Sequence, residues 1–372
     1  MVSSRSTSTA APLWSEFSFR GRDFIRATVP RGDNAGLPFT IAKRLAERYE
    51  VRQFFASGGC GLLLEGRDLR TEADVLIKTT LRYDGLIEYA RCRDEDGFRK
   101  KLTDHRKQLQ TERRIMVLLK NRGCNSIPNP NDYVFDWNPQ LSEPIAGEAG
   151  AWQFQDEALL SSEPYLIMER MEGRPVTEAI GRGMKEPLAL HVLAQVCHVL
   201  AELHVPVMRD GREWQLVYQD LKPDNVLLGD HEAVSLLDLG GCRLMFGNMV
   251  GSKGAFTPGY CPPECQTSDR MTPTTDAYTV GSTLYHMLTG IEPRTLLGST
   301  ALTGGPQSVP FRNWDWPSLA AKVTPMTYNF VRRCLAERAT NRPADGRALC
   351  AEIAELRRLS GDRQEMVYQP EA

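Results

Sequence analysis

The segment from residue 218 to residue 225 reads Tyr218-Gln219-Asp220-Leu221-Lys222-Pro223-Asp224-Asn225 and decides the fold of this chain. It is a polar loop flanked by apolar residues, and the whole stretch 216–238 reads as two short strands around that loop. A second polar group, Asp238-Leu239-Gly240, closes the apolar run at residues 234–237. Taken alone the loop is an ordinary polar turn. With Asp238-Leu239-Gly240 following it, an ordinary turn becomes the less favoured interpretation of this loop.

Further patterns lie on both sides of the loop. Upstream, a hairpin bends around glycines at residues 56–61, and a short strand at residues 75–79 carries Lys78 near its end. Downstream, a Gly- and Pro-rich stretch at residues 239–264 is followed by apolar periodicity that predicts helices at residues 275–288, 326–336 and 347–359. A strand-rich first part followed by a helix-rich second part predicts an α+β protein with two lobes, divided near Gly173.

In this order the patterns resemble the eukaryotic-type (Hanks-type) serine/threonine protein kinase family over residues 50–358. The segments that carry the resemblance are Ala56-Ser57-Gly58-Gly59-Cys60-Gly61, Val75-Leu76-Ile77-Lys78, residues 165–173, the loop 218–225, Asp238-Leu239-Gly240, Thr257-Pro258-Gly259-Tyr260-Cys261-Pro262-Pro263-Glu264, Asp276-Ala277-Tyr278-Thr279-Val280-Gly281 and Asn341-Arg342-Pro343. The resemblance implies a bilobal, protein-kinase-like α+β fold with a β-rich N-lobe and a helical C-lobe.

The resemblance also implies a role for each residue of the loop. Asp220 would orient the substrate hydroxyl and accept its proton, and Lys222 would neutralise charge on the transferring γ-phosphate of ATP. Asn225 and Asp238 would bind Mg²⁺. Glu264 would form a buried ion pair with Arg342 and close the lower lobe.

A nucleotide site in the first lobe is implied as well. Lys78 would hold the α- and β-phosphates of ATP and pair with Glu112 on a long charged helix, with Glu95 as the competing partner. The glycines of residues 56–61 would let backbone N–H groups approach the phosphates. The residues expected to contact the nucleotide are Ala56, Ser57, Gly58, Gly59, Cys60, Gly61, Leu63, Leu76, Lys78, Met168, Glu169, Met171 and Leu227. Leu76 stands where the family usually has Ala, so we expect crowding around adenine.

Two residues of the loop depart from the family pattern. Tyr218 stands where His is expected, and Gln219 where Arg is expected. In the family that arginine receives a phosphate from the activation segment, and Gln cannot pair with such a charge. We therefore expect activity that does not depend on activation-segment phosphorylation, with Ser252 as the residue to test. Lys222 and Thr257 favour serine and threonine acceptors over tyrosine.

The expected domain limits follow from these motifs. An N-terminal extension occupies residues 1–49, the N-lobe residues 50–172 with insertions near 89–108 and 138–162, the C-lobe residues 173–359, and a tail residues 360–372. Residues 93–107 read either as an insertion or as an N-terminal extension of the helix that carries Glu112. Within the extension, residues 1–14 read as disordered and the remainder as packed on the N-lobe. Ile41, Leu45 and Tyr49 recur every four residues and predict a helix at residues 39–49.

Composition places the chain in a broad class. It has 372 residues and a formal net charge of -2, so no overall charge attracts it to nucleic acid. No apolar run approaches the roughly 18 residues of a membrane helix. The nine cysteines are odd in number and scattered, which indicates reduced thiols and a cytoplasmic protein.

Two other functions compete with a protein kinase. A pseudokinase or ATP-binding scaffold is favoured by the departures at Ala56, Leu76, Tyr218 and Gln219, although no expected metal ligand or base is missing. A small-molecule phosphotransferase is disfavoured by residues 257–264 and Arg342, because these serve a peptide-binding platform. The favoured interpretation has ATP, Mg²⁺ and a protein substrate with a serine or threonine acceptor as partners.

Overall fold

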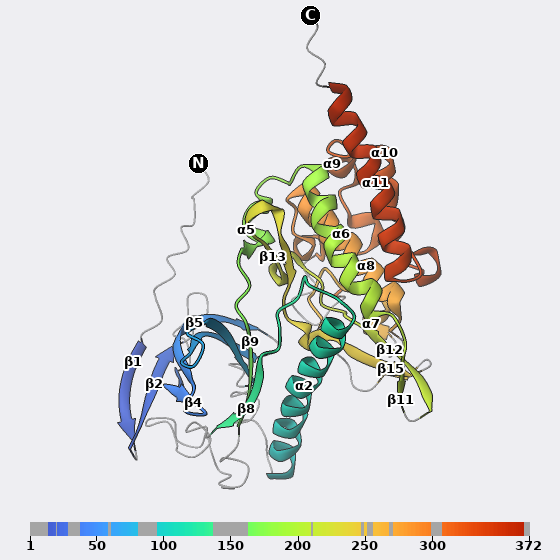
Figure 1. The fold of residues 1–372 in the computed structure, drawn as a ribbon. Helices are drawn as coiled ribbons and strands as arrows, with labels where there is room; N and C mark the ends of the chain where they lie inside the picture. Colours follow the sequence, from blue (N-terminus) through green and yellow to red (C-terminus); the bar gives the residue numbers. More distant parts are fainter. Residues whose placement is uncertain are drawn as a thin grey trace, which may run out of the picture. The chain divides into compact units, whose positions relative to one another are not determined.

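The computed structural model describes residues 14–19, 21–28, 38–58, 61–80, 95–136, 163–209, 211–246, 249–250, 256–267, 271–298 and 307–367. The chain divides into two compact units (Figure 1). Unit 1 comprises residues 1–114 and 129–170, and unit 2 comprises residues 115–128 and 171–372. Residues 115–128 therefore belong with the second half of the chain, which the expected division near Gly173 did not anticipate.

Unit 1 is built on a six-stranded antiparallel sheet. Its strands are β4 (Arg44–Leu45), β5 (Tyr49–Gly58), β6 (Gly61–Asp68), β7 (Asp74–Thr79), β9 (Glu163–Glu169) and β8 (Asp132–Asp136), in that spatial order. Strands β7 and β9 are neighbouring interior strands of this sheet, and their apolar residues are buried nearly throughout. A strand covered on both faces reads as a continuous apolar run, as Val75-Leu76-Ile77 does here.

A second sheet, of three antiparallel strands, precedes the first. It consists of β1 (Trp14–Phe19), β2 (Arg22–Thr28) and β3 (Pro38–Ala42). Phe24, Ile25 and Ile41 from this sheet share one hydrophobic core with the six-stranded sheet. The extension is thus part of the core of unit 1, while residues 1–13 lie outside the described part of the chain.

The helix expected at residues 39–49 is wrong. These residues form β3, β4 and the beginning of β5, and the backbone turns sharply at Ala46 and Glu47, whose φ angles are 46° and 53°. Ile41, Leu45 and Tyr49 are all buried. A spacing of four is a multiple of the two-residue strand period as well as close to one helical turn, so this spacing alone could not separate helix from strand.

A long helix, α2 (Glu95–Asn121), follows the first strands of the sheet. Its apolar residues Leu109, Ile115, Met116 and Leu119 are buried along one side. Residues 95–107 extend this helix at its N-terminal end, which was one of the two expectations for that stretch. The remaining insertion residues, 89–94 and 138–162, lie outside the described part of the chain.

Unit 2 contains two small antiparallel sheets beside its helices. One consists of β10 (Arg174–Pro175), β13 (Val226–Leu228) and β14 (Val234–Leu236). The other consists of β11 (Val207–Arg209), β12 (Arg212–Val217), β15 (Arg243–Phe246) and β16 (Met249–Val250). The polar loop 218–225 joins β12 to β13, so it is held at both ends by a sheet.

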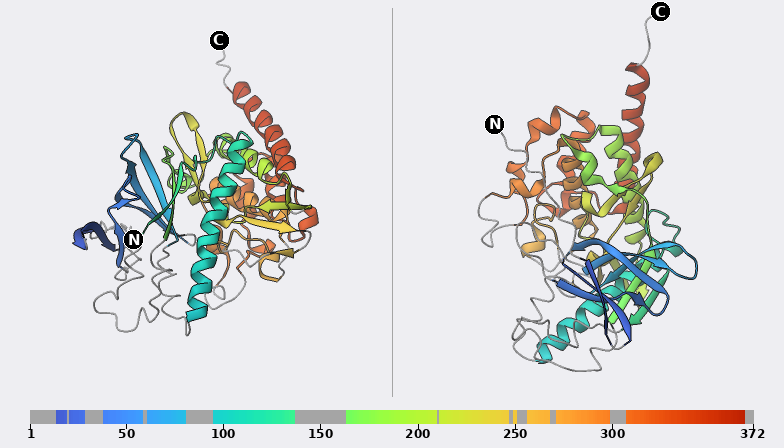
Figure 2. Two further views of the ribbon diagram at one scale, coloured as in Figure 1. Left: turned by 60° about the horizontal axis from the view of Figure 1, so that its bottom comes forward. Right: turned by 90° about the vertical axis from the view of Figure 1, so that its left-hand side faces the viewer.

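The helices of unit 2 are α5 (Val176–Ile180), α6 (Glu186–Leu203), α7 (Glu264–Thr267), α8 (Pro273–Thr289), α9 (Trp316–Ala320), α10 (Pro325–Cys334) and α11 (Gly346–Val367). Helix α8 is buried along almost its whole length and packs against α6, α10 and α11 (Figure 2). A Cβ on Gly281 would lie 2.5 Å from Cβ of Cys334, so glycine permits the close approach of α8 and α10. The α+β prediction is confirmed.

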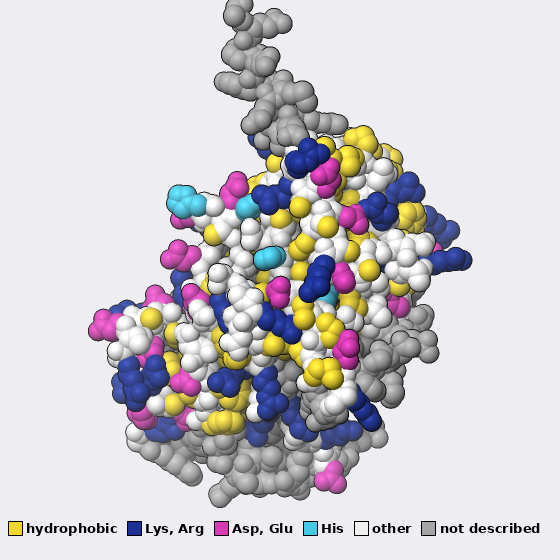
Figure 3. All heavy atoms as spheres, turned by 45° about the vertical axis from the view of Figure 1, so that its right-hand side comes forward, with side chains coloured by type: hydrophobic (Ala, Val, Ile, Leu, Met, Phe, Trp, Pro, Cys, Tyr) yellow, Lys and Arg dark blue, Asp and Glu magenta, His cyan; other side chains and the backbone are white. Residues whose placement is uncertain are grey.

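Seven cysteines lie in the described residues, and none of them forms a disulfide there. In the same part of the chain, no helix is both long enough and apolar enough to span a bilayer. Figure 3 shows acidic, basic and apolar side chains interspersed over the upper part of one face.

Candidate active site

The loop 218–225 is held in place from beneath by helix α8. Asp276, which is completely buried on α8, accepts hydrogen bonds from the backbone N–H of Tyr218 and of Gln219, each at 2.7 Å. Gln219 has a φ of 71°, a left-handed conformation that non-glycine residues seldom adopt. Two charge-assisted hydrogen bonds to the carboxylate stabilise this unusual turn immediately before Asp220.

The Asp276 carboxylate is itself oriented by a histidine. His204 at the end of α6 lies with Nε2 2.9 Å from Oδ2 of Asp276, and its Nδ1 accepts the N–H of Gly346 at 2.8 Å. Because Nδ1 accepts a backbone hydrogen, the proton of the neutral ring is assigned to Nε2, which donates to Asp276. No motif in the sequence points to His204; its signal is a histidine at the buried end of an amphipathic helix.

Asp220, Lys222 and Thr257 form a compact polar cluster. Thr257 donates from Oγ1 to Oδ1 of Asp220 at 2.5 Å, and Lys222 Nζ lies 2.9 Å from Thr257 Oγ1 and 3.3 Å from Oδ2 of Asp220. Burial raises the pKa of Asp220, and Asp238 adds to that effect while Lys222 and Thr257 oppose it. A carboxylate with a raised pKa is a better proton acceptor at neutral pH than an ordinary exposed aspartate.

Asn225 and Asp238 supply oxygen atoms close to this cluster. The amide nitrogen of Asn225 donates to the Asp220 carbonyl at 2.8 Å, which leaves its amide oxygen for another ligand. Asp238 has a left-handed backbone, and its Oδ1 accepts the N–H of Gly240 at 3.1 Å in the turn η3 (Leu239–Gly241). Carboxylate and amide oxygens are the donors that Mg²⁺ prefers, so these two residues fit the expected metal.

Tyr218 links the two segments that carry those oxygens. Its buried hydroxyl donates to the Leu237 carbonyl at 3.0 Å and lies 3.5 Å from the amide nitrogen of Asn225. The N–H of Leu237 also donates to the Asn225 carbonyl at 2.8 Å. The departure from histidine at this position thus provides a hydroxyl that connects Asn225 to Leu237, the residue before Asp238.

The ion pair expected between Glu264 and Arg342 is present and bidentate. The guanidinium donates from Nη1 and Nη2 to the two carboxylate oxygens at 2.6 and 3.0 Å. It also donates to the backbone carbonyls of Ala336, Thr274 and Glu337. The Arg342 side chain is fully buried, and its bonds to the protein balance the loss of water around the charge.

In unit 1, Lys78 and Glu112 form a buried ion pair with Nζ 2.7 Å from Oε1. A second ion pair joins the same helix to the sheet, because Arg106 donates to Glu163 Oε2 from Nε at 3.1 Å and from Nη2 at 2.8 Å. Thr80 also donates to Glu163, and burial raises the pKa of that glutamate. No motif in the sequence points to this second ion pair, because Arg106 lies in the stretch that reads either as an insertion or as helix.

The expected nucleotide-binding residues fall in both units. In unit 1, Leu63 lies opposite Lys78, and Leu76 lies opposite Met168, on paired strands. Leu76 and Met168 are 1% and 5% exposed. The N–H of Glu169 donates to the Asn129 carbonyl at 2.9 Å. Because this N–H is already paired, the backbone contact expected between Glu169 and adenine falls to the carbonyl oxygen of Glu169.

The glycine-rich segment is the hairpin between β5 and β6. Ser57 pairs with Leu62 and Gly58 with Gly61, and the register shifts between Phe54 and Ala56. Gly59 and Cys60, at its tip, lie outside the described residues. The remaining two expected contacts, Met171 and Leu227, belong to unit 2, where Leu227 is buried on β13.

Residues 151–354 match the protein kinase domain family. The chain belongs to this family. It is 29% identical over 316 residues to the serine/threonine-protein kinase PknL of Mycobacterium bovis, a match that covers 83% of this chain and 65% of PknL. It is 29% identical over 188 residues to serine/threonine-protein kinase A of Synechocystis, covering 48% of this chain and 36% of that protein.

A third relative is PknB of Mycobacterium tuberculosis, which is 27% identical over 263 residues, covering 69% of this kinase chain and 34% of PknB. The chain thus spans about two thirds or less of the length of these curated relatives. The family predicted from the motifs is confirmed.

Proposed function

We propose that this chain is a serine/threonine protein kinase that transfers the γ-phosphate of ATP to protein hydroxyls. The observation that carries the proposal is the cluster of Asp220, Lys222 and Thr257, in which a carboxylate that is 12% exposed and has a raised pKa lies beside a lysine ammonium group. Such a pair can accept a proton and neutralise phosphate charge at one place.

The proposed reaction assigns each step to a residue. Asp220 accepts the proton of the acceptor hydroxyl while the hydroxyl oxygen forms a bond to the γ-phosphorus, and the bond between that phosphorus and the β,γ-bridging oxygen breaks to release ADP. Lys222 neutralises charge on the phosphoryl group in transit. Bound Mg²⁺, held by Asn225 and Asp238, would neutralise phosphate charge. Lys78, positioned by Glu112, supplies the positive charge for the other phosphates.

Thr257 supports the assignment of the acceptor. Its hydroxyl is engaged by both Asp220 and Lys222, so it holds the lysine beside the carboxylate. In the family, a lysine in this loop and a threonine at this place are typical of kinases for serine and threonine, as inferred from the motifs.

We further propose that activity does not require phosphorylation of the activation segment. Gln219 is 2% exposed, and both polar atoms of its side chain are without a hydrogen-bond partner among the described residues. An uncharged, buried amide offers no ionic partner for a phosphate. Arg243 braces the turn after Asp238 instead, since its Nη1 donates to the carbonyls of Gly240, Gly241 and Cys242.

The test is a phosphate-transfer assay with Mg²⁺, ATP and generic protein acceptors, with phosphoserine and phosphothreonine identified in the product. Asp220→Asn should reduce transfer by at least about a thousandfold, because it removes the proton acceptor. Asp224→Asn is the matched control, because Asp224 is exposed in the same loop and only accepts a bond from Thr177. Equal activity of the wild type and Asp220→Asn would refute the enzyme and favour a pseudokinase.

The proposed independence from activation-segment phosphorylation is tested in a separate experiment. Ser252, which lies outside the described residues, is replaced by Ala, and the wild type is separately treated with a phosphatase before assay. Both preparations should keep full activity. A large loss in Ser252→Ala that an acidic residue at that position restores would refute independence from phosphorylation without affecting the catalytic proposal.

A further inference from the structure

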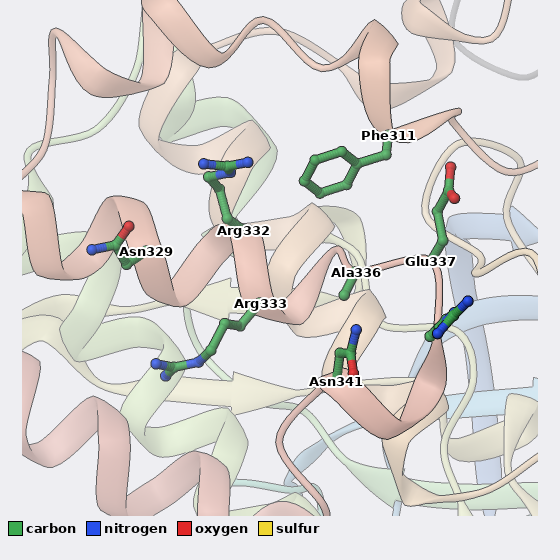
Figure 4. A pocket seen from close by; sticks show the side chains of 8 residues that line it. Phe311, Asn329, Arg332, Arg333, Ala336, Glu337 and Asn341 are labelled. Carbon is green, nitrogen blue, oxygen red and sulfur yellow. The ribbon is translucent and has the colours of Figure 1, made fainter.

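Unit 2 has an open hollow of about 700 Å³ at the end of α10 (Figure 4). It lies between the last turns of that helix, residues 336–341 that follow it, and Phe311, and we call it the arginine hollow. In Figure 4 the Phe311 ring and the Arg332 side chain approach each other, while Ala336 and Asn341 lie beneath them. None of these residues belongs to the candidate active site.

The charges of the arginine hollow are unbalanced. Arg332, Arg333 and Arg338 line it, with Glu337 as the acidic lining residue. Arg333 forms an ion pair with Glu352, and in Figure 4 its side chain is directed away from Phe311. Among the described residues, Arg332 and Arg338 have no carboxylate partner.

Arg332 is held in place by aromatic rings, and its guanidinium donates no hydrogen bond to any described residue. Its guanidinium lies 5.5 Å from the ring centre of Phe311, 5.5 Å from that of Trp316 and 5.7 Å from that of Tyr328. Contact with aromatic faces orients a guanidinium and leaves its N–H groups available to an anion. The side-chain amides of Asn329 and Asn341 place further donors around the same space.

The lower wall of the hollow is rigid. The carbonyls of Ala336 and Glu337 accept hydrogen bonds from Arg342 at 2.7 and 3.0 Å, and Arg342 is anchored in turn by Glu264. Because this wall is already fixed, the site loses less conformational entropy when a ligand binds. Attraction of Arg332 and Arg333 to the C-terminal end of α10 accounts for part of this cluster, but not for Arg338, which lies beyond the helix.

The lining chemistry indicates the class of ligand. Small-molecule sites enclose most of their ligand, whereas this hollow is open and has three arginines and two asparagines among its lining residues. Guanidinium groups bind phosphate through paired charge-assisted hydrogen bonds, and arginine clusters recognise phosphorylated segments in this way. The Phe311 ring offers an apolar surface beside the charge.

We propose that the arginine hollow binds a phosphoserine or phosphothreonine of an extended protein segment. The choice of a phosphorylated protein as the source of the phosphate rests on the proposed function, because a serine/threonine kinase works on proteins that carry such groups. Binding there would keep a protein already phosphorylated once close to the enzyme. The arginines of the hollow then act as a docking site for substrate and take no part in phosphate transfer.

The experiment measures binding by fluorescence anisotropy, without ATP, using the full chain. The probe is a fluorescein-labelled heptapeptide with phosphoserine at its centre and Gly and Ala elsewhere. It should bind at least about tenfold more tightly than the same peptide with serine, and Arg338→Gln should weaken it about tenfold, as loss of one charge-assisted contact predicts. Arg347→Gln, a change at an exposed arginine at the start of α11, should leave binding unchanged.

Two variants separate recognition from folding. Arg332→Lys keeps the charge but loses the guanidinium geometry, so it should also weaken binding, while Arg338→Gln should keep the wild-type melting temperature and the wild-type rate on an unphosphorylated acceptor. Equal binding of the phosphorylated and unphosphorylated peptides would overturn the proposal. So would unchanged phosphopeptide binding in Arg338→Gln and Arg332→Lys.

Other occupants are decided in the same assay. Labelled oligouridylate that binds more tightly than the phosphopeptide and responds to Arg338→Gln would assign the hollow to nucleic acid and overturn the proposal. Inorganic phosphate should compete only at millimolar concentration or above. Because no ATP is present, and because Asp220→Asn should bind the phosphopeptide normally, failure of the proposed catalytic function would leave this result intact and recognisable.

Discussion

The hydroxyl of Tyr218 provides the most specific test of how this site is organised. Tyr218→Phe keeps the buried ring and removes only the group that donates to the Leu237 carbonyl at 3.0 Å and lies 3.5 Å from the Asn225 amide. A buried carbonyl left without its partner costs about 1–3 kcal/mol of folding free energy. No cavity larger than the missing oxygen is created, so the loss should remain near the lower end of that range.

The functional consequence should appear in the metal dependence. Leu237 precedes Asp238, and Asn225 carries the second candidate ligand, so loosening both should raise the Mg²⁺ concentration that gives half-maximal activity. If about 1 kcal/mol of positioning energy is lost, that concentration rises about fivefold. The assay is phosphate transfer at saturating ATP over a range of Mg²⁺ concentrations, with urea unfolding of the same proteins.

Tyr278→Phe is a closely matched control. Tyr278 is also buried in unit 2, and its hydroxyl also donates to a backbone carbonyl, that of Val309 at 3.3 Å. It should lose similar stability and keep the wild-type Mg²⁺ requirement. The reasoning fails if Tyr218→Phe keeps the wild-type requirement, or if Tyr278→Phe raises it by the same factor.

Three further outcomes follow from buried groups of unit 2. Arg342→Met should lower the free energy of unfolding by about 3–5 kcal/mol in urea titration, because it leaves the carboxylate of the ion pair and several carbonyls unpaired, whereas Arg347→Met at the surface should change it by less than about 0.5 kcal/mol. Gly281→Ala should cost about 1–3 kcal/mol in the same titration, since its Cβ would lie 2.5 Å from that of Cys334. The acid limb of the pH profile of kcat/KM should lie at a pH above the ordinary pKa range of aspartate. The reason is that Asp220 must be ionised to accept a proton and that burial raises its pKa. An acid limb at or below the ordinary aspartate pKa would contradict this.

Local sequence patterns predicted the strands and helices whose formation depends on residues close together in the sequence. The strands around the loop 218–225 and helices α8, α10 and α11 lie where apolar periodicity placed them, because each buries one stripe of contiguous sequence. The prediction failed at residues 39–49, where a repeat of four fits both periods. Positive φ angles at Ala46 and Glu47 carry no strong signature in residue type, so the turn between β4 and β5 could not be read from the sequence.

Contacts between distant residues could be predicted only where a family motif names both partners. Lys78 with Glu112, and Glu264 with Arg342, are such pairs, and both are joined in the structure. The bond between Arg106 and Glu163 spans 57 positions and has no motif behind it. Charged residues are common on any helix, so their identity gives no indication of which one is buried.

By itself, the sequence determined the family and the chemical groups available, because the order of the motifs and the residue types within them are properties of the chain. It also showed that Tyr218 and Gln219 depart from the family pattern. Only the tertiary structure decided what those departures do: the Tyr218 hydroxyl joins Leu237 to Asn225, and the Gln219 amide is buried without a described partner. Hydrogen bonding and burial depend on which distant groups come into contact when the chain folds. The burial that results also raises the pKa of Asp220.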